Sequence, residues 1–277
     1  MTNKNNHANT PLEVLINCLE IVQSLAQKEQ LSAELKSYLD QARTLAAGLD
    51  SYITKYSAAP SAGLDLIALA TQNQPWAQWY QAKKIKNPLK PSMQSSPFQA
   101  QLLKCLVQIT KSKRVLEIGM FTGYATLAIA EALPKDGRVI ACEHDAQVVE
   151  IAEKLLRDTP HFAKIEIRLA DGRETLKQLI KEEQVFDLIF LDANKRAYLE
   201  YYQLILDGNL LEAQGVLCVD NTLFKGEVFA PKSKIAQAIA EFNQVVAEDY
   251  RVEQIILPVD DGLSLIRLKK LENLSVK

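Results

Sequence analysis

The sequence has no long apolar run, little cysteine and no excess of charge of either sign. No apolar stretch approaches the roughly 18 to 20 residues that a membrane-spanning helix needs. The start MTNKNNHANT lacks the apolar centre of a secretion signal. The formal charge of −2 gives no basic face for nucleic acid or an anionic membrane. These absences favour a cytoplasmic protein whose partner is a small molecule, with neither nucleic acid nor a membrane involved.

The four cysteines are widely separated, and three of them fall in apolar stretches: Cys18, Cys105, Cys142 and Cys218. Free cysteine is among the residue types most often buried in proteins. We therefore expect reduced, buried thiols.

The first part of the chain has helical periodicity, from residue 11 to about residue 82. One helix is predicted to begin at residue 11 and a second to cover about 32–56, with two shorter ones after it. The stretch KKIKNPLKPS, residues 83–92, combines prolines with lysines and suits an exposed connection. The boundary predicted there separates a helical N-terminal extension, residues 1–85, from a second domain, residues 86–277.

Beyond this boundary, short β-rich runs alternate with amphipathic segments, which is typical of βαβ units. Continuous apolar runs such as LIFL and VLCV indicate strands covered on both faces, so we predict an α/β, doubly wound, mostly parallel sheet. The last two runs are separated by only three residues and should form an antiparallel hairpin. The predicted strands are 114–119, 138–143, 164–169, 186–192, 215–220, 251–258 and 262–268. Ligands of such sheets bind beyond the carboxyl ends of the strands.

The first predicted strand runs into a loop with two glycines, Gly119 and Gly123, four residues apart. Glycine lets the backbone turn tightly and approach a ligand before a helix starts. The loop does not match GxGxxG, the turn that binds a dinucleotide pyrophosphate. A sulfonium cofactor has no phosphate, and its amino acid end needs a carboxylate, which Glu117 provides. The alternative is a simple tight turn between strand and helix.

Two further signals follow the second and third strands. Glu143 ends the second strand, 24 residues after Gly119, where an acidic side chain accepts hydrogen bonds from ribose hydroxyls. Asp171 and Gly172 follow the third strand, where adenine is expected to lie. Together these signals favour an adenosine-containing cofactor, although Glu143 alone could be a solvated strand end.

Oxygen-bearing side chains end the fourth and fifth strands, with Asp192 after FDLIFL and Asp220-Asn221 at the end of GVLCVDN. If those strands are neighbours, the three side chains meet at one sheet edge, because adjacent strands lie about 4.8 Å apart. Three hard oxygen ligands suit Mg²⁺, Ca²⁺ or Mn²⁺ and disfavour zinc. The alternative is that Asp220-Asn221 merely caps the next loop.

Lys195 lies three residues after Asp192, on the same loop, and can reach the space above the predicted metal. A lysine near a cation and partly desolvated can have a lowered pKa and act as a general base. The alternative is an ordinary solvated lysine.

Several motifs in order, LEIGMFTGYATLAIAEALPKDGRVIACE, FDLIFLDANKRAYLEYY, GVLCVDNTLFKGEV and DGLSLIRL, resemble the cation-dependent O-methyltransferases of the caffeoyl-CoA and catechol type. The resemblance covers about residues 90 to 270. It implies a seven-stranded, Rossmann-like methyltransferase sheet with an antiparallel final strand, and a homodimer. It also implies methyl transfer from S-adenosylmethionine to one of two adjacent oxygens of a small acceptor.

Carried over by position, the resemblance implies Asp192, Asp220 and Asn221 as metal ligands and Lys195 as the base, with Asp192 also catalytic. The implied cofactor contacts are Ser95, Glu117, Gly119, Met120, Gly123, Glu143, Asp171, Gly172 and Asp192.

Three positions depart from the family pattern. Ala125 replaces a serine that bonds the methionine carboxylate, and Asn194 replaces the second aspartate of the usual DADK. Phe224 replaces a common tryptophan beside the substrate, and Lys225 follows it, which suggests an acceptor other than a phenylpropanoid thioester. The long helical extension resembles the O-methyltransferases of cyanobacterial mycosporine biosynthesis. That likeness implies a cyclohexenone precursor of 4-deoxygadusol as acceptor.

Four alternatives remain at this point: a catechol or caffeoyl-type acceptor, a metal-independent methyltransferase with a structural Asp-Asn pair, a nicotinamide oxidoreductase, and a cofactor-binding regulatory or scaffold protein. The lack of GxGxxG disfavours the oxidoreductase. Full activity in excess chelator would favour the metal-independent enzyme. Cofactor binding without turnover would favour the scaffold.

Overall fold

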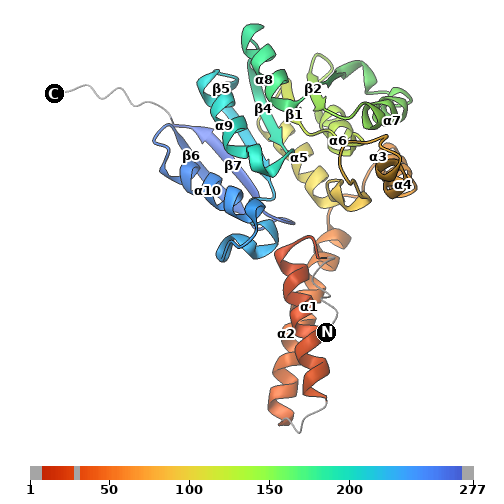
Figure 1. Cartoon of the computed structure of the whole chain (residues 1–277), viewed down its shortest axis with the longest axis vertical. Coiled ribbons are helices and arrows are strands. Elements are labelled where there is room, and N and C mark those ends of the chain that lie inside the picture. The colour runs from red at the N-terminus through yellow and green to blue at the C-terminus, as the bar shows by residue number, and fades with distance from the viewer. Residues whose placement is uncertain (1–7, 28–31, 270–277) are drawn as a thin grey trace, which may run out of the picture.

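The computed structural model describes residues 8–27 and 32–269. Figure 1 shows an α/β body from which a two-helix hairpin projects. The hairpin consists of α1 (Pro11–Ala26) and α2 (Ala33–Tyr56), which pack against each other. Among the described helices, none is both long and apolar enough to cross a bilayer.

The body is built on one seven-stranded sheet in the order β3-β2-β1-β4-β5-β7-β6. Neighbouring strands pair in parallel except around β7, which is antiparallel to both β5 and β6. This confirms the predicted doubly wound sheet and its antiparallel final strand. The strands are β1 (Arg114–Ile118), β2 (Arg138–Glu143), β3 (Ile165–Leu169), β4 (Phe186–Leu191), β5 (Leu211–Asp220), β6 (Val252–Leu257) and β7 (Leu263–Leu268). β5 begins four residues earlier than predicted, and a register irregularity between Phe186 and Leu188 separates its first pairing from the rest.

Helices cover both faces of the sheet, as the apolar strands require. On one face, Leu116 and Ile118 of β1 pack in the cluster formed by α8, α9 and α10. On the other, Val115 packs with α5 and α6, while α7 covers β2 and β3. These helices are α5 (Pro97–Ile109), α6 (Tyr124–Ala132), α7 (Ala146–Arg157), α8 (Gly172–Lys181), α9 (Tyr198–Asp207) and α10 (Lys234–Glu248). Short 3-10 turns lie at Pro91–Met93, Phe162–Lys164, Lys195–Ala197 and Phe224–Phe229.

Two short helices of the N-terminal region pack against the body, α3 (Ala62–Gln72) and α4 (Trp76–Gln81). Leu64 and Ile67 of α3 are fully buried in a cluster with Met120 of the loop after β1. The predicted boundary between 1–85 and 86–277 stays a prediction, but the packing groups α3 and α4 with the α/β body. The α1–α2 hairpin projects from the body and contacts it where α1 meets the Phe224–Phe229 turn and α2 meets α5.

The cysteines are free, as expected, but only two are buried. Cys142 on β2 and Cys218 on β5 lie in the core, whereas Cys18 and Cys105 are exposed. The expectation of burial was wrong for Cys18 because it lies on the outer side of the projecting hairpin, and for Cys105 because it lies on the solvent side of α5.

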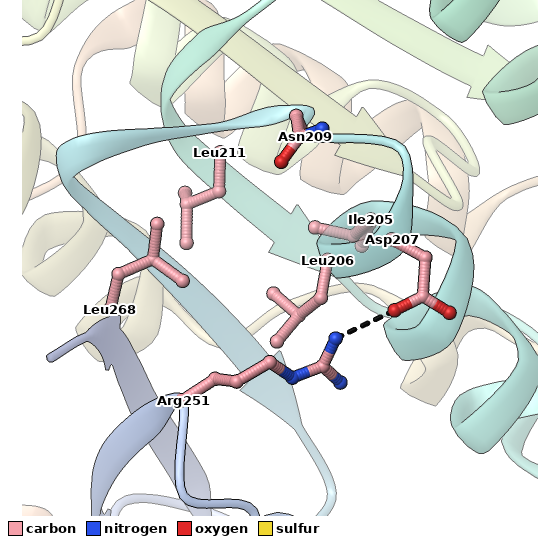
Figure 2. Close-up of a pocket in the computed structure, with 7 residues that line it drawn as sticks. All are labelled: Ile205, Leu206, Asp207, Asn209, Leu211, Arg251 and Leu268. Atoms are coloured by element: carbon pink, nitrogen blue, oxygen red, sulfur yellow. Dashed lines mark hydrogen bonds and ion pairs between the residues drawn. The ribbon is translucent and has the colours of Figure 1, made fainter.

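A cavity of about 290 Å³ lies between α9 and the start of β5 (Figure 2). Its wall is largely aliphatic, with an ion pair between Arg251 and Asp207 at 2.6 Å. Leu211 begins β5 and Leu268 ends the antiparallel β7, so the cavity lies at the amino end of β5. It is therefore at the opposite end of the sheet from the predicted ligand residues.

Candidate active site

The loop after β1 lies against the ends of β2 and β4. Gly119 and Met120 donate their backbone N–H groups to the carbonyl of Cys142, at 3.1 and 2.9 Å. Gly119 has φ of +99°, and a Cβ atom there would lie 2.0 Å from the carbonyl oxygen of Asp192. Only glycine fits this approach, so the conformation expected at this position is confirmed. Its effect is to bring the loop after β1, residues 119–123, against the end of β4. We call this segment the cofactor loop because the sequence predicts cofactor contacts in it.

Glu117 is a buried carboxylate with one unused oxygen. Its side chain is 1% exposed, and Oε2 accepts a hydrogen bond from the Thr126 hydroxyl on α6. Oε1 is buried and has no partner. Burial raises the pKa of Glu117 to about 8, and the nearby Asp192 and Glu143 carboxylates add to this. A buried acceptor with no donor is costly, and a cationic ammonium group would satisfy it.

Glu143 lies at the end of β2, facing the same loop. Its Oε2 accepts the backbone N–H of Phe121 at 3.0 Å, and its Oε1 accepts those of His144 and Asp145. The Glu143–His144 contact raises the pKa of the imidazole, through the side-chain hydrogen bond first and the carboxylate charge as well. Glu143 is thus fixed at the mouth of the loop, which rules out the freely solvated strand end considered from the sequence.

The other predicted cofactor residues lie at different distances from this centre. Gly123 precedes α6 with φ of +89°. Gly172 starts α8, where an added Cβ would lie 2.9 Å from Ile118 of β1. Asp171 caps α8 and forms an ion pair with Arg173 at 2.8 Å, so its visible role is structural. Ser95 is half-buried just before α5.

The three predicted metal ligands end adjacent strands. β4 pairs with β5 in parallel with Leu191 opposite Val219, so the next residues, Asp192 and Asp220, follow the same edge. Asn221 comes directly after, with φ of +59°. Within the described residues, no group of three or more His, Cys, Asp and Glu side chains is placed to hold a metal. The predicted set consists of two carboxylates and one amide.

Asp220 is a buried carboxylate with one unpaired oxygen. The residue is 6% exposed, and its Oδ1 is buried with no hydrogen-bond partner. Burial raises the pKa of Asp220 well above its ordinary value, and the Asp192 carboxylate raises it further. A buried carboxylate is normally paired or binds a metal, and the nearby Asp192 is only partly exposed. The residues present therefore fit a hard divalent cation.

Lys195 completes this cluster through an ion pair with Asp192, Nζ to Oδ1 at 2.6 Å. Burial by itself lowers the pKa of the lysine, but the Asp192 and Asp220 carboxylates raise it by more. The net pKa is therefore above the ordinary value, opposite to the lowered pKa expected for a base. A lowered pKa at Lys195 requires that positive charge at the cluster offset these carboxylates.

Asp261, for which the sequence predicts no role, holds Asn221, one of the predicted metal ligands. It lies in the turn before β7, and its Oδ2 accepts a hydrogen bond from the Asn221 amide at 3.2 Å. Its Oδ1 accepts the backbone N–H of Lys225. Burial raises the pKa of Asp261 to about 6. Because the amide nitrogen of Asn221 donates to Asp261, its oxygen remains free to coordinate.

Two further contacts were also missed from the sequence. Tyr198 is fully buried at the start of α9, and its hydroxyl has no hydrogen-bond partner. Burial raises the pKa of this hydroxyl, and the charges of Asp192 and Asp220 raise it further. The cofactor loop is held by the N-terminal helices, since the Thr71 and Thr122 hydroxyls lie 2.7 Å apart and Trp76 stacks on Phe121 with ring centres 5.1 Å apart. No spacing rule in the sequence links these positions.

Comparison with known proteins identifies the family of this chain. A sequence profile of the O-methyltransferase family matches residues 70–269. The chain belongs to this family. Similar proteins include catechol O-methyltransferase domain-containing protein 1 of Mus musculus, 35% identical over 204 residues, covering 72% of this chain and 77% of that protein. Caffeoyl-CoA O-methyltransferase 5 of Nicotiana tabacum is 33% identical over 186 residues, covering 63% of this chain and 77% of that protein.

Solved structures of other methyltransferases share the fold. The SAH-bound methyltransferase PaMTH1 of Podospora anserina superposes with a TM-score of 0.70 at 28% identity, covering 82% of this chain and 96% of that chain. The O-methyltransferase of Bacillus cereus in complex with SAH gives a TM-score of 0.68 at 26% identity, covering 80% and 97%. This O-methyltransferase is therefore a SAM-dependent enzyme, and the loop around Gly119 is its candidate cofactor site.

Proposed function

We propose that this O-methyltransferase requires a divalent cation, Mg²⁺ first and Ca²⁺ or Mn²⁺ as alternatives, and methylates a small acceptor with two adjacent oxygens. The observation that carries the proposal is the unpartnered, buried Oδ1 of Asp220 beside Asp192. Both carboxylates lie at the sheet edge that meets the cofactor loop at Gly119. A cation at this edge would therefore lie next to the bound cofactor.

The chain would hold S-adenosylmethionine, which supplies the methyl group, through side chains at three strand ends. The free Oε1 of Glu117 is the acceptor for an ammonium group, with Thr126 fixing the other oxygen. Glu143 would receive the ribose hydroxyls, and Gly172 gives α8 a close approach to Ile118 at the floor of the site. Ala125 on α6 is 4% exposed and carries no hydroxyl, so the carboxylate contact of the family's serine is absent there.

Asp192, Asp220 and Asn221 would hold the cation, and Asp261 orients the Asn221 amide toward it. A divalent cation bound there supplies Lewis acidity, which lowers the pKa of an acceptor hydroxyl that coordinates it. Oxygen ligands of this type match the preferences of Mg²⁺ and Ca²⁺. The two carboxylates balance its charge.

Lys195 is placed to take the proton of the acceptor hydroxyl at Nζ. Its Nζ lies 2.6 Å from Oδ1 of Asp192, and the carboxylates of Asp192 and Asp220 raise its pKa. Neutralisation of those carboxylates removes the charges that raise its pKa, which favours the free amine that a base needs. The acceptor oxygen then forms a bond to the methyl carbon while the carbon–sulfur bond breaks. Much of the rate would come from holding oxygen and methyl carbon close and in line.

We propose first a chemical class for the acceptor and then one specific acceptor. The caffeoyl-CoA and catechol-type relatives support a small molecule with adjacent oxygens. Phe224 stands where the family commonly has tryptophan, and Lys225, whose backbone Asp261 holds, follows it. Both residues favour a different acceptor. A cyclohexenone precursor of 4-deoxygadusol, suggested by the likeness of the helical extension, remains a prediction, as do the cytoplasmic location and the homodimer.

The test is methyl transfer from labelled S-adenosylmethionine to catechols, caffeoyl-type esters and cyclohexenone enediols, each with Mg²⁺ and with excess chelator. The proposal expects turnover that chelator abolishes and Mg²⁺ restores. Turnover unaffected by chelator would support a metal-independent methyltransferase. Cofactor binding with no turnover on any acceptor would favour a regulatory or scaffold role.

A further inference from the structure

The projecting hairpin has two different faces. Along α2, the half-buried or buried positions Leu39, Ala46 and Ile53 recur every seven residues. α2 packs mainly on α1, to which the Gln23 amide and the Asp40 carboxylate tie it at 2.7 Å. One face of α2 is therefore accounted for within the chain.

A second apolar seam runs along α2, and all of its residues except the half-buried Ala42 are exposed to solvent. Its spacing alternates between three and four residues for three heptads, which is the pattern of a coiled-coil interface. We call this the open seam: Leu35, Tyr38, Ala42, Leu45, Leu49, Tyr52 and Tyr56. Leu45 is 76% exposed and Tyr52 and Tyr56 are each 66% exposed. A surface helix of a monomer normally carries polar residues at such positions.

α1 carries a shorter seam of the same kind, Leu15, Cys18, Val22 and Leu25, spaced three, four and three residues apart. All four are exposed. In these two helices the buried residues are Ala26 and Ala46. The two helices bury little against each other, and each exposes an apolar seam. A second pair of helices that covers both seams would therefore stabilise the hairpin.

The exposed area matches what a dimer interface needs. A covered aromatic side chain buries about 150–250 Å², so Tyr38, Tyr52 and Tyr56, at 62%, 66% and 66% exposure, offer together about 300–500 Å². The leucines of the open seam and the α1 seam add to this. A standard interface buries about 800 Å² per partner, which the two seams together can reach.

The charges beside the open seam indicate the partner's direction. Glu34 lies in the first turn of α2 and Lys55 in the last, and each directly precedes a seam residue. In an antiparallel pair of α2 helices, Glu34 of one copy approaches Lys55 of the other. A parallel pair would instead bring Glu34 against Glu34 and Lys55 against Lys55, which is repulsive.

We propose that the open seam binds the same seam of a second copy of this chain, antiparallel, so that the two hairpins form a four-helix bundle. The two-fold symmetry of such a contact makes the same patch complementary to itself. The bundle joins two α/β bodies through elements that precede the family-matched region, residues 70–269, and it does not depend on the proposed metal or acceptor.

The test measures the mass of the full chain by sedimentation equilibrium. The wild type should have about twice the chain mass of 31.0 kDa. Leu45→Glu/Leu49→Glu should reduce this to a monomer because it places charge in the middle of the open seam. The control Thr44→Glu/Ser51→Glu adds the same charge at exposed positions of α2 outside the seam and should remain a dimer. A monomeric wild type, or a double seam variant that remains a dimer, would overturn the proposal.

A cross-linking experiment covers the case in which the seam variant fails to fold. In a Cys18→Ser/Cys105→Ser background, which removes the exposed thiols, Leu45→Cys near the middle of the seam should form an intermolecular disulfide on mild oxidation. Leu35→Cys at its end should not, since the antiparallel partner places its own residue 35 at the far end. Equal cross-linking at both positions, or at neither, would contradict the antiparallel pair.

Discussion

The buried carboxylate of Glu117 should make the free energy of unfolding depend on pH. Its replacement by glutamine should therefore destabilise the chain at low pH and stabilise it at high pH. Without cofactor, its pKa is raised from 4.5 to about 8. The unfolded chain ionises this group at lower pH than the folded chain does. Stability from Glu117 is therefore complete below about pH 4.5 and is lost as pH rises toward 8. The loss corresponds to about 4 kcal/mol at pH 8 and less than about 1 kcal/mol at pH 5.

Glu117→Gln removes this ionisation and keeps the shape of the side chain. The Thr126 hydroxyl can still donate to the amide oxygen, but the new buried NH₂ lacks an acceptor and costs about 1–3 kcal/mol. We therefore expect the variant to be less stable than wild type by about 1–2 kcal/mol at pH 5 and more stable by about 2–3 kcal/mol at pH 8.

The assay is urea unfolding of cofactor-free protein at both pH values, followed by fluorescence of Trp76 and Trp79, which pack at the cofactor loop. Glu174→Gln, an exposed carboxylate on α8, is the matched control. Glu117→Gln should also weaken S-adenosylmethionine binding by roughly 10- to 100-fold, since it removes a charge-assisted hydrogen bond, whereas the control should bind the cofactor like the wild type. A free-energy difference between Glu117→Gln and wild type that is equal at pH 5 and pH 8 would refute the reasoning.

Three other substitutions test separate parts of the site. Asp261→Asn should weaken Mn²⁺ binding by roughly 10- to 100-fold with cofactor affinity unchanged, because Asp261 holds Asn221 and the backbone of Lys225 but no predicted cofactor residue. Calorimetric titrations with each ligand check this, and equal Mn²⁺ affinity would argue against the contact between Asp261 and Asn221. Lys195→Met should lower kcat by roughly 10²- to 10⁴-fold and leave cofactor affinity intact. Single-turnover methyl transfer measures the rate, and an unchanged rate would show that Lys195 is not the base. Gly119→Ala should destabilise the body by about 2–4 kcal/mol, seen as a lower Tm, because the added Cβ would overlap the Asp192 carbonyl; an unchanged Tm would contradict the close approach.

The sheet and its carboxyl edge could be predicted because their signals are local. Each strand is a short apolar run, and Glu117, Glu143, Asp192 and Asp220 follow such runs directly. Parallel pairing then places strand ends at one edge without further information. The positive φ of Gly119 was predictable for the same reason, since the tight turn after a strand favours glycine.

Contacts between distant segments could not be predicted in this way. Asp261 reaches Asn221 across 40 positions only because β7 pairs with β5. Thr71 reaches Thr122 only because α3 packs on α6. The exposure of Cys18 was misjudged because helical periodicity identifies an apolar face but not what covers it. The raised pKa of Lys195 depends on Asp220, a neighbour that only the folded sheet supplies.

Mn²⁺ binding to the wild type and to Asp220→Asn, followed by electron paramagnetic resonance without cofactor or acceptor, tests the proposed metal site most directly. Asp136→Asn, which changes an exposed carboxylate remote in sequence from the strand ends, is the matched control. We predict one Mn²⁺ site in the wild type and the control, and at least a 100-fold loss of affinity in Asp220→Asn, about 3 kcal/mol. Equal binding by all three proteins would place the cation elsewhere and contradict the metal-dependent mechanism.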